Sequence, residues 1–173
     1  MGTKRVGWAR IRSLINENGN LLQRKYRQVK EVSSTTTLTA ADSGSTIVWT
    51  KGSAHDITLP AAAEGLHFRV IIAVGAAANH YIKTASTADV FFGKAVINTS
   101  NATEAAPAVQ IVTKATGLSS TIDRIHLHKS NAANGGQAGD VIDIYAVDDT
   151  YWLVDARLTT SNGTPNAAAV LIA

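Results

Sequence analysis

The sequence predicts an all-β sandwich of jelly-roll type, with an extended N-terminal arm that contains a short amphipathic helix. Three observations lead to this prediction. Many short segments alternate apolar and polar residues and are separated by turn residues. The 173 residues are only 17% charged and rich in Ser, Thr, Asn, Gly and Ala, which is typical of one β domain with tight loops. The basic residues are concentrated near the N-terminus.

The arm, residues 1–33, is distinguished by its charge. Residues 1–30 contain eight basic residues and one acid, a net charge of +7. The rest of the chain has eight basic and twelve acidic residues, a net charge of −4. Because a positively charged tail on a compact domain is suited to binding, we expect the arm to hold a partner.

Residues 6–17 of the arm have the periodicity of an amphipathic helix. Their apolar side chains recur at spacings of three and four and so share one face: Trp8, Ile11, Leu14 and Ile15. Asn18-Gly19-Asn20 is expected to end this helix, and residues 21–32 fit either a helix or an extended segment. A helix this short is marginal alone in water, so we expect the arm to be ordered by the surface it contacts.

From about Thr35 the hydrophobic period changes to that of β-strands, and residues 34–160 are predicted to form the body. The clearest strand runs from Leu66 to Ile72, whose apolar residues alternate with His67 and Arg69. Residues 98–107 are expected to form a polar loop. The tail, residues 161–173, begins like a linker and ends in an apolar segment that should pack on its own sheet or on a neighbour. The other predicted strands are 35–39, 46–50, 56–59, 80–84, 89–92, 109–113, 122–128, 141–147 and 151–158.

Several classes of protein are excluded or disfavoured by the composition. The absence of cysteine excludes disulfides, thiolate metal sites and a cysteine nucleophile. The N-terminus lacks the apolar region of a secretory signal, and Val6 argues against myristoylation. No apolar run approaches the roughly 18 residues of a membrane span, so a membrane-embedded protein is not expected.

We expect no catalytic, cofactor or metal site. His126 and His128 share a face of their predicted strand, and a solvent-facing pair opposite Ile125 and Leu127 is favoured over a metal site. A structural calcium ion is the less favoured reading of an acidic stretch without EF-hand spacing. No glycosidase carboxylate pair, phosphate loop or nucleophile elbow is evident. The acidic stretch comprises Asp140, Asp143, Asp148, Asp149 and Asp155.

Two sets of aromatic residues, one in the arm and one in the body, allow alternative interpretations of what the protein binds. Trp8 and Tyr26 would stack on bases if the arm bound nucleic acid, but the apolar stripe of the helix favours a groove on a protein. A steep salt dependence of binding would indicate phosphate contacts instead. The aromatic residues of the body would form either a sugar-stacking platform or part of the core, and the core is the default for aromatic residues in strands. These residues are Trp49, Trp152, Tyr81, Tyr145 and Tyr151.

Several segments resemble virion proteins of tailed phages. In the body these are Leu38–Ile47 with Asp56–Pro60 and Gly65–Val70, then Gly139–Tyr145 with Tyr151–Val154. The opening Arg5–Ile11 resembles the starts of phage head proteins. The family suggested is the capsid decoration, or cement, proteins, which are small β modules that lock capsomers together. Similar segments also occur in phage fibres and other virion parts.

The resemblance implies a non-enzymatic structural protein on the capsid surface, assembled in the host cytoplasm. Its partners would be the major capsid protein and other copies of itself, with a homotrimer favoured over a dimer. The rival function is that of a tail or head-fibre module that binds host-surface glycans. The residues expected to contact the capsid all lie in the arm: Arg5, Trp8, Arg10, Ile11, Arg12, Leu14, Ile15, Arg24, Lys25, Tyr26 and Arg27.

Overall fold

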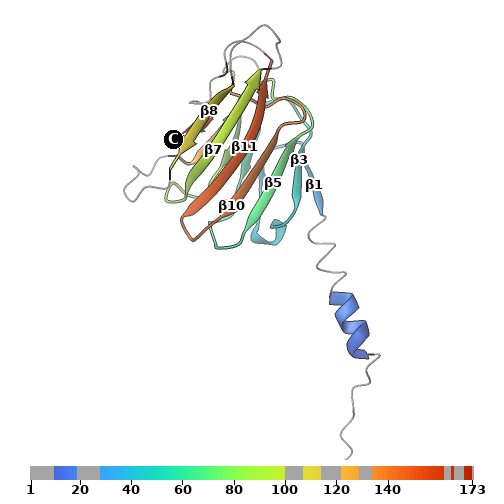
Figure 1. Ribbon diagram of the computed structural model, residues 1–173. Helices are drawn as coiled ribbons and strands as arrows, with labels where there is room; N and C mark the ends of the chain where they lie inside the picture. Colours follow the sequence, from blue (N-terminus) through green and yellow to red (C-terminus); the bar gives the residue numbers. More distant parts are fainter. Residues whose placement is uncertain are drawn as a thin grey trace, which may run out of the picture.

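Two β-sheets pack face to face around one apolar core (Figure 1). The computed structural model describes residues 10–18, 28–99, 107–113, 122–128, 134–161, 165 and 170–172. Within these residues the predicted all-β sandwich is confirmed, and residues 10–18 form a helix of the arm.

The larger sheet has seven strands in the order β1-β3-β5-β10-β11-β7-β8, and the smaller has five in the order β12-β9-β6-β4-β2. A short 3-10 helix, η1 (Ala40–Asp42), precedes β3. The strands are β1 Val29–Val32, β2 Thr36–Thr37, β3 Thr46–Trp49, β4 Asp56–Thr58, β5 His67–Ile72, β6 His80–Lys83, β7 Val90–Thr99, β8 Ala108–Val112, β9 Arg124–Leu127, β10 Val141–Ala146, β11 Tyr151–Thr160 and β12 Leu171–Ile172.

The strand directions depart from the expected jelly-roll type. The first six strands alternate between the sheets, so β1, β3 and β5 become parallel neighbours in one sheet and β2, β4 and β6 in the other. Strands β7 and β11 are also parallel. In the described residues, therefore, five of the ten strand pairs are parallel, whereas a jelly roll is antiparallel.

The core is formed by the inward-facing residues of both sheets. In β5, Phe68, Val70 and Ile72 are buried while the intervening residues face outward, as the alternation predicts. Trp49 and Trp152 are 1% and 0% exposed, so both belong to the core and neither can stack on a sugar. Burial of these large apolar side chains is the main stabilising term of the body.

The longest pairing in the sandwich joins β7 and β11 over ten residues. Gly93 makes it possible: its φ is +127°, and a Cβ added there would lie 2.1 Å from the carbonyl oxygen of Val154. A side chain at this position would therefore clash with the partner backbone. Strand β7 continues to Thr99, so the predicted strand 89–92 was too short and the predicted loop 98–107 began too early.

Both ends of the sandwich differ from the expected boundaries. Strand β1 pairs in parallel with β3, so residues 29–32 belong to the body and the arm ends before position 33. Strand β12 pairs with β9, which places the apolar end of the chain on its own sheet. The Gln110 side chain of β8 fastens this end, because its Nε2 donates to the Leu171 carbonyl oxygen at 3.0 Å and its Oε1 accepts from the Leu171 amide at 2.9 Å.

Candidate functional site

The arm helix exposes an apolar stripe. All nine residues from 10 to 18 are exposed, and Figure 1 shows the helix apart from the two sheets. Ile11, Leu14 and Ile15 are 38%, 50% and 61% exposed, and Leu14 and Ile15 follow Ile11 at the helical spacings of three and four. Arg10 and Arg12 lie on the same short helix, so five of the predicted contact residues are brought together. The other predicted contacts lie outside the described residues: Arg5, Trp8, Arg24, Lys25, Tyr26 and Arg27.

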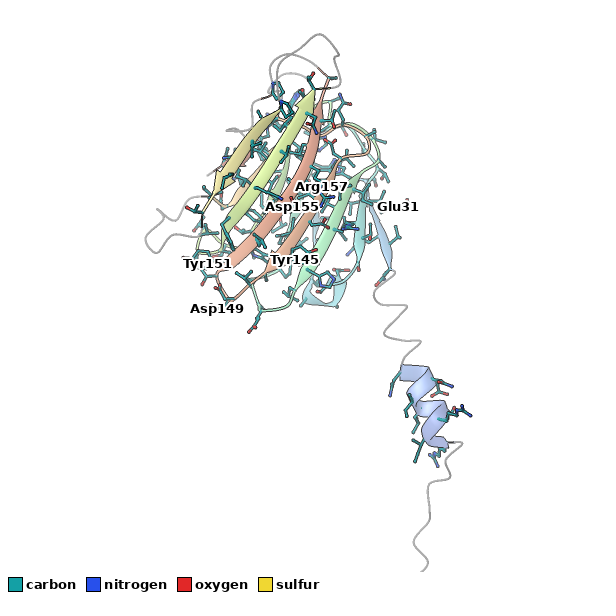
Figure 2. The ribbon with its side chains drawn as sticks, viewed as in Figure 1. Glu31, Tyr145, Asp149, Tyr151, Asp155 and Arg157 are labelled. Atoms are coloured by element: carbon teal, nitrogen blue, oxygen red, sulfur yellow. The ribbon has the colours of Figure 1, made fainter. Side chains whose placement is uncertain are left out.

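A second candidate surface is the outer face of the seven-stranded sheet, which is turned away from the core. Figure 2 shows Tyr145, Asp155 and Arg157 on this face. The strand register aligns one residue from each of the seven strands in a single central row. In strand order this row is Val29, Thr46, Arg69, Asp143, Asp155, Lys94 and Ile111.

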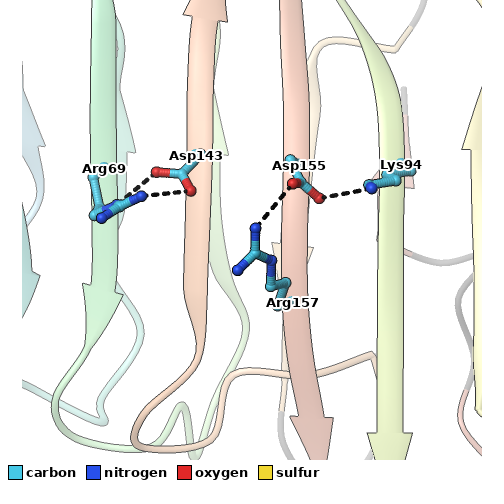
Figure 3. A network of polar contacts seen from close by, with 5 residues as sticks. All are labelled: Arg69, Lys94, Asp143, Asp155 and Arg157. Atoms are coloured by element: carbon cyan, nitrogen blue, oxygen red, sulfur yellow. Dashed lines mark hydrogen bonds and ion pairs between the residues drawn. The ribbon is translucent and has the colours of Figure 1, made fainter.

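The middle of the central row is held by ion pairs (Figure 3). Arg69 donates from Nε to Asp143 Oδ1 at 2.7 Å and from Nη2 to Oδ2 at 3.0 Å, a bidentate pair that raises the pKa of Arg69. Asp155 is paired with Arg157 at 3.3 Å and with Lys94 at 3.6 Å. Since Asp143 and Asp155 are direct cross-strand neighbours, these cations offset the repulsion between two carboxylates.

The rows on either side are largely apolar or aromatic. Val48, Ile71 and Val141 align on one side of the central row, and Tyr145, Leu153 and Phe92 align on the other. Towards β8, Val109 and Ile111 are 55% and 72% exposed, and a groove of about 550 Å³ lies over β11, β7 and β8. This mixture of exposed apolar and charged side chains is typical of a surface that contacts other molecules.

The predicted histidine pair is only partly as expected. Ile125 and Leu127 are buried on the inner face, and His126 lies on the outer face, where its ring stacks on Tyr81 at 4.8 Å. Burial, and secondarily His128, lower the pKa of His126. His128, however, is only 6% exposed, so the prediction that it faces solvent was wrong: it follows the end of β9 and is covered there. Among the described residues, no three His, Asp or Glu side chains cluster as metal ligands would.

The aspartates of the acidic stretch have separate structural roles. The buried Asp140 accepts backbone N–H bonds from Gly136, Gln137 and Thr159. Asp143 and Asp155 belong to the ion pairs of the outer face, whereas Asp148 accepts the amides of Thr150 and Tyr151 in the β10–β11 turn. The predicted turn at this position is therefore confirmed.

Sequence reasoning missed a buried histidine cluster. His55 and His80 pack with Trp49, with ring centroids 4.8–4.9 Å apart. The two ring nitrogens of His80 lie 3.2 Å from the carbonyl oxygen of His55 and 3.1 Å from that of Gly52. Burial lowers the pKa of His80 even though both carbonyls oppose this. No local sequence signal distinguishes these histidines, because the cluster unites two separate strands and a loop.

No protein-family model, curated protein or solved structure matches this chain. In the part of the chain that the structure describes, no helix is long and apolar enough to cross a membrane. The arm and the outer face are therefore the features of the molecule from which a function is inferred.

Proposed function

We propose that this protein is a non-enzymatic structural component of a tailed-phage virion, which binds the outside of the capsid and bridges major capsid protein subunits through its N-terminal arm. The observation that carries the proposal is the arm helix, whose apolar stripe is exposed beside arginines. The resemblance of the arm and body segments to phage virion proteins supports the same conclusion.

The stripe has the chemistry of a segment that docks in a protein groove. Ile11, Leu14 and Ile15 form one edge of the helix, and burying all three would contribute about 5–9 kcal/mol before the cost of ordering the arm. Arg10 and Arg12 can pair with carboxylates at the rim of such a groove. Phosphate binding alone would not require the apolar stripe.

The body complements the arm as a rigid module. Its two sheets share one core, and its polar turns are fixed by side chains such as Asp140 and Asp148. A surface component of a shell acts in many copies, so a modest affinity of each arm is multiplied by avidity. We propose self-association as well, with a homotrimer favoured, because shells offer many threefold positions.

The test is cosedimentation with shells assembled from the major capsid protein of the phage that encodes this chain. We expect saturable binding of the full-length protein, and loss of binding on deletion of residues 2–20 with the body still folded. A triple substitution of Ile11, Leu14 and Ile15 by Ser should weaken binding by at least about 100-fold. Binding that is unchanged by the deletion would refute the role of the arm.

A matched control separates the apolar stripe from the charge of the arm. The double substitution of Ser13 and Asn16 by Ala alters the opposite side of the same helix without removing an apolar or charged side chain, and it should leave binding unchanged. Binding that disappears steeply with added salt and survives loss of the stripe would indicate phosphate contacts, and so nucleic acid rather than the capsid.

A further inference from the structure

A hollow of about 240 Å³ opens on the outer face of the seven-stranded sheet, where β3, β5 and β10 are neighbours. It lies between two adjacent rows of the sheet. One row supplies Arg69 and Asp143, and the next supplies His67 and Tyr145. The side chains around the hollow therefore come from long, well-paired strands, which gives a binding site a fixed shape.

The first wall of the hollow is a planar polar edge. The guanidinium of Arg69 is fixed by its bidentate pair with Asp143, which uses two of its five N–H donors. The Arg69 side chain is 54% exposed, so further donors face solvent beside the carboxylate oxygens of Asp143. Donors and acceptors thus lie next to each other on one plane, and the two formal charges cancel.

The second wall is aromatic. The rings of His67 and Tyr145 are stacked with an interplanar angle of 16° and a centroid distance of 6.0 Å. Tyr145 is 42% exposed, although it lies in the centre of the sheet rather than at an edge. An aromatic side chain exposed in this way offers an apolar ring together with a hydroxyl that can bond a ligand.

We propose that this hollow binds one pyranose ring of a glycan. The paired charges of Arg69 and Asp143 suit vicinal hydroxyls, which both donate and accept, and the aromatic wall suits the C–H face of a sugar ring. The carboxylate disfavours an anionic ligand, and the polar lining disfavours an apolar one. This activity goes beyond capsid binding and uses no residue of the arm.

The test is an NMR titration of the full-length protein with glucose, galactose, mannose, N-acetylglucosamine and rhamnose, each at millimolar concentrations. We expect saturable amide shifts for at least one sugar, confined to residues 44–46, 67–69 and 143–145. A single small hollow of this kind should bind with millimolar to high micromolar affinity. The absence of a saturable shift with every sugar would overturn the proposal.

Three variants make the test specific. Tyr145→Ala removes the aromatic wall, and Arg69→Lys keeps the charge but loses the planar fork; each should weaken binding at least about tenfold. Tyr81→Ala, which removes a stacked tyrosine from the outer face of the other sheet, should bind like the wild type. Equal binding by Tyr145→Ala and the wild type would place the sugar elsewhere and refute the assignment.

The same variants separate this proposal from the capsid function. Tyr145→Ala should cosediment with capsid shells like the wild type, since it leaves the arm intact. Loss of sugar binding with normal capsid binding is the expected result, and the reverse pattern would be found in the arm deletion.

Discussion

Asp140 permits a quantitative test of how the body is held together. It lies just before β10 and is 4% exposed. Its Oδ2 accepts N–H bonds from Gly136 at 2.8 Å, Gln137 at 2.9 Å and Thr159 at 3.0 Å. One oxygen atom therefore joins the turn before β10 to strand β11. We expect Asp140→Ala to be among the most destabilising single substitutions in the protein.

The magnitude follows from the amides left without an acceptor. Each buried N–H that loses its partner costs about 1–3 kcal/mol, and three neighbouring losses are not fully additive. We therefore expect Asp140→Ala to lower the free energy of unfolding by about 3–5 kcal/mol. For a domain of this size, that corresponds to a decrease in Tm on the order of 10 °C.

Asp140→Asn is the matched control, since it keeps an acceptor oxygen and removes the charge. Burial raises the pKa of Asp140, although the hydrogen bonds oppose this, so the ionised carboxylate costs stability as pH rises above its ordinary value of 3.8. The three N–H bonds are weaker when they are donated to the neutral amide oxygen of Asn, but the variant no longer buries a charge, and the second effect offsets the first. We therefore expect Asp140→Asn to stay within about 1 kcal/mol of the wild type.

The assay is urea unfolding of the wild type and both variants at neutral pH, followed by tryptophan fluorescence. Trp49 and Trp152 report on it because both lie in the core. A loss of stability below about 1 kcal/mol for Asp140→Ala would refute the argument that this oxygen holds the turn before β10 to β11. Equal losses of stability for Asp140→Ala and Asp140→Asn would show that the charge of Asp140, and not its acceptor oxygen, stabilises the protein.

Three further predictions concern other parts of the sandwich. Gly93→Ala should destabilise the protein by more than about 3 kcal/mol, because its Cβ would clash with Val154; soluble expression and thermal unfolding check this, and wild-type stability would contradict it. Lowering the pH from about 7.5 to about 5.5 should reduce the free energy of unfolding, because folding lowers the pKa of His80 and the unfolded chain therefore takes up the proton first, near 6.5. Urea unfolding at both pH values measures this effect. Equal stability at the two pH values would contradict it. Gln110→Ala should speed hydrogen exchange at the Leu171 amide with a global loss of only about 1–2 kcal/mol, and unchanged exchange would show that β12 is held by its pairing with β9 alone.

The class of the fold and most of its strands were predictable from local patterns in the sequence. The alternation of Phe68, Val70 and Ile72 with the residues between them predicts which side chains are buried, because successive residues of a strand face opposite sides of the sheet. The stripe formed by Ile11, Leu14 and Ile15 was predicted in the same way from helical spacing. Both are local patterns, so they need no knowledge of which segments meet.

Tertiary structure alone decided the strand order, the parallel pairings and the outer face of the larger sheet. Strand β1 was ambiguous in the sequence, and its pairing with β3 makes it part of the body. Arg69 and Asp143 are 74 positions apart, and Asp143 and Asp155 share a row only because β10 pairs with β11 in one particular register. Such neighbours are set by the packing of two whole sheets, which no local spacing records.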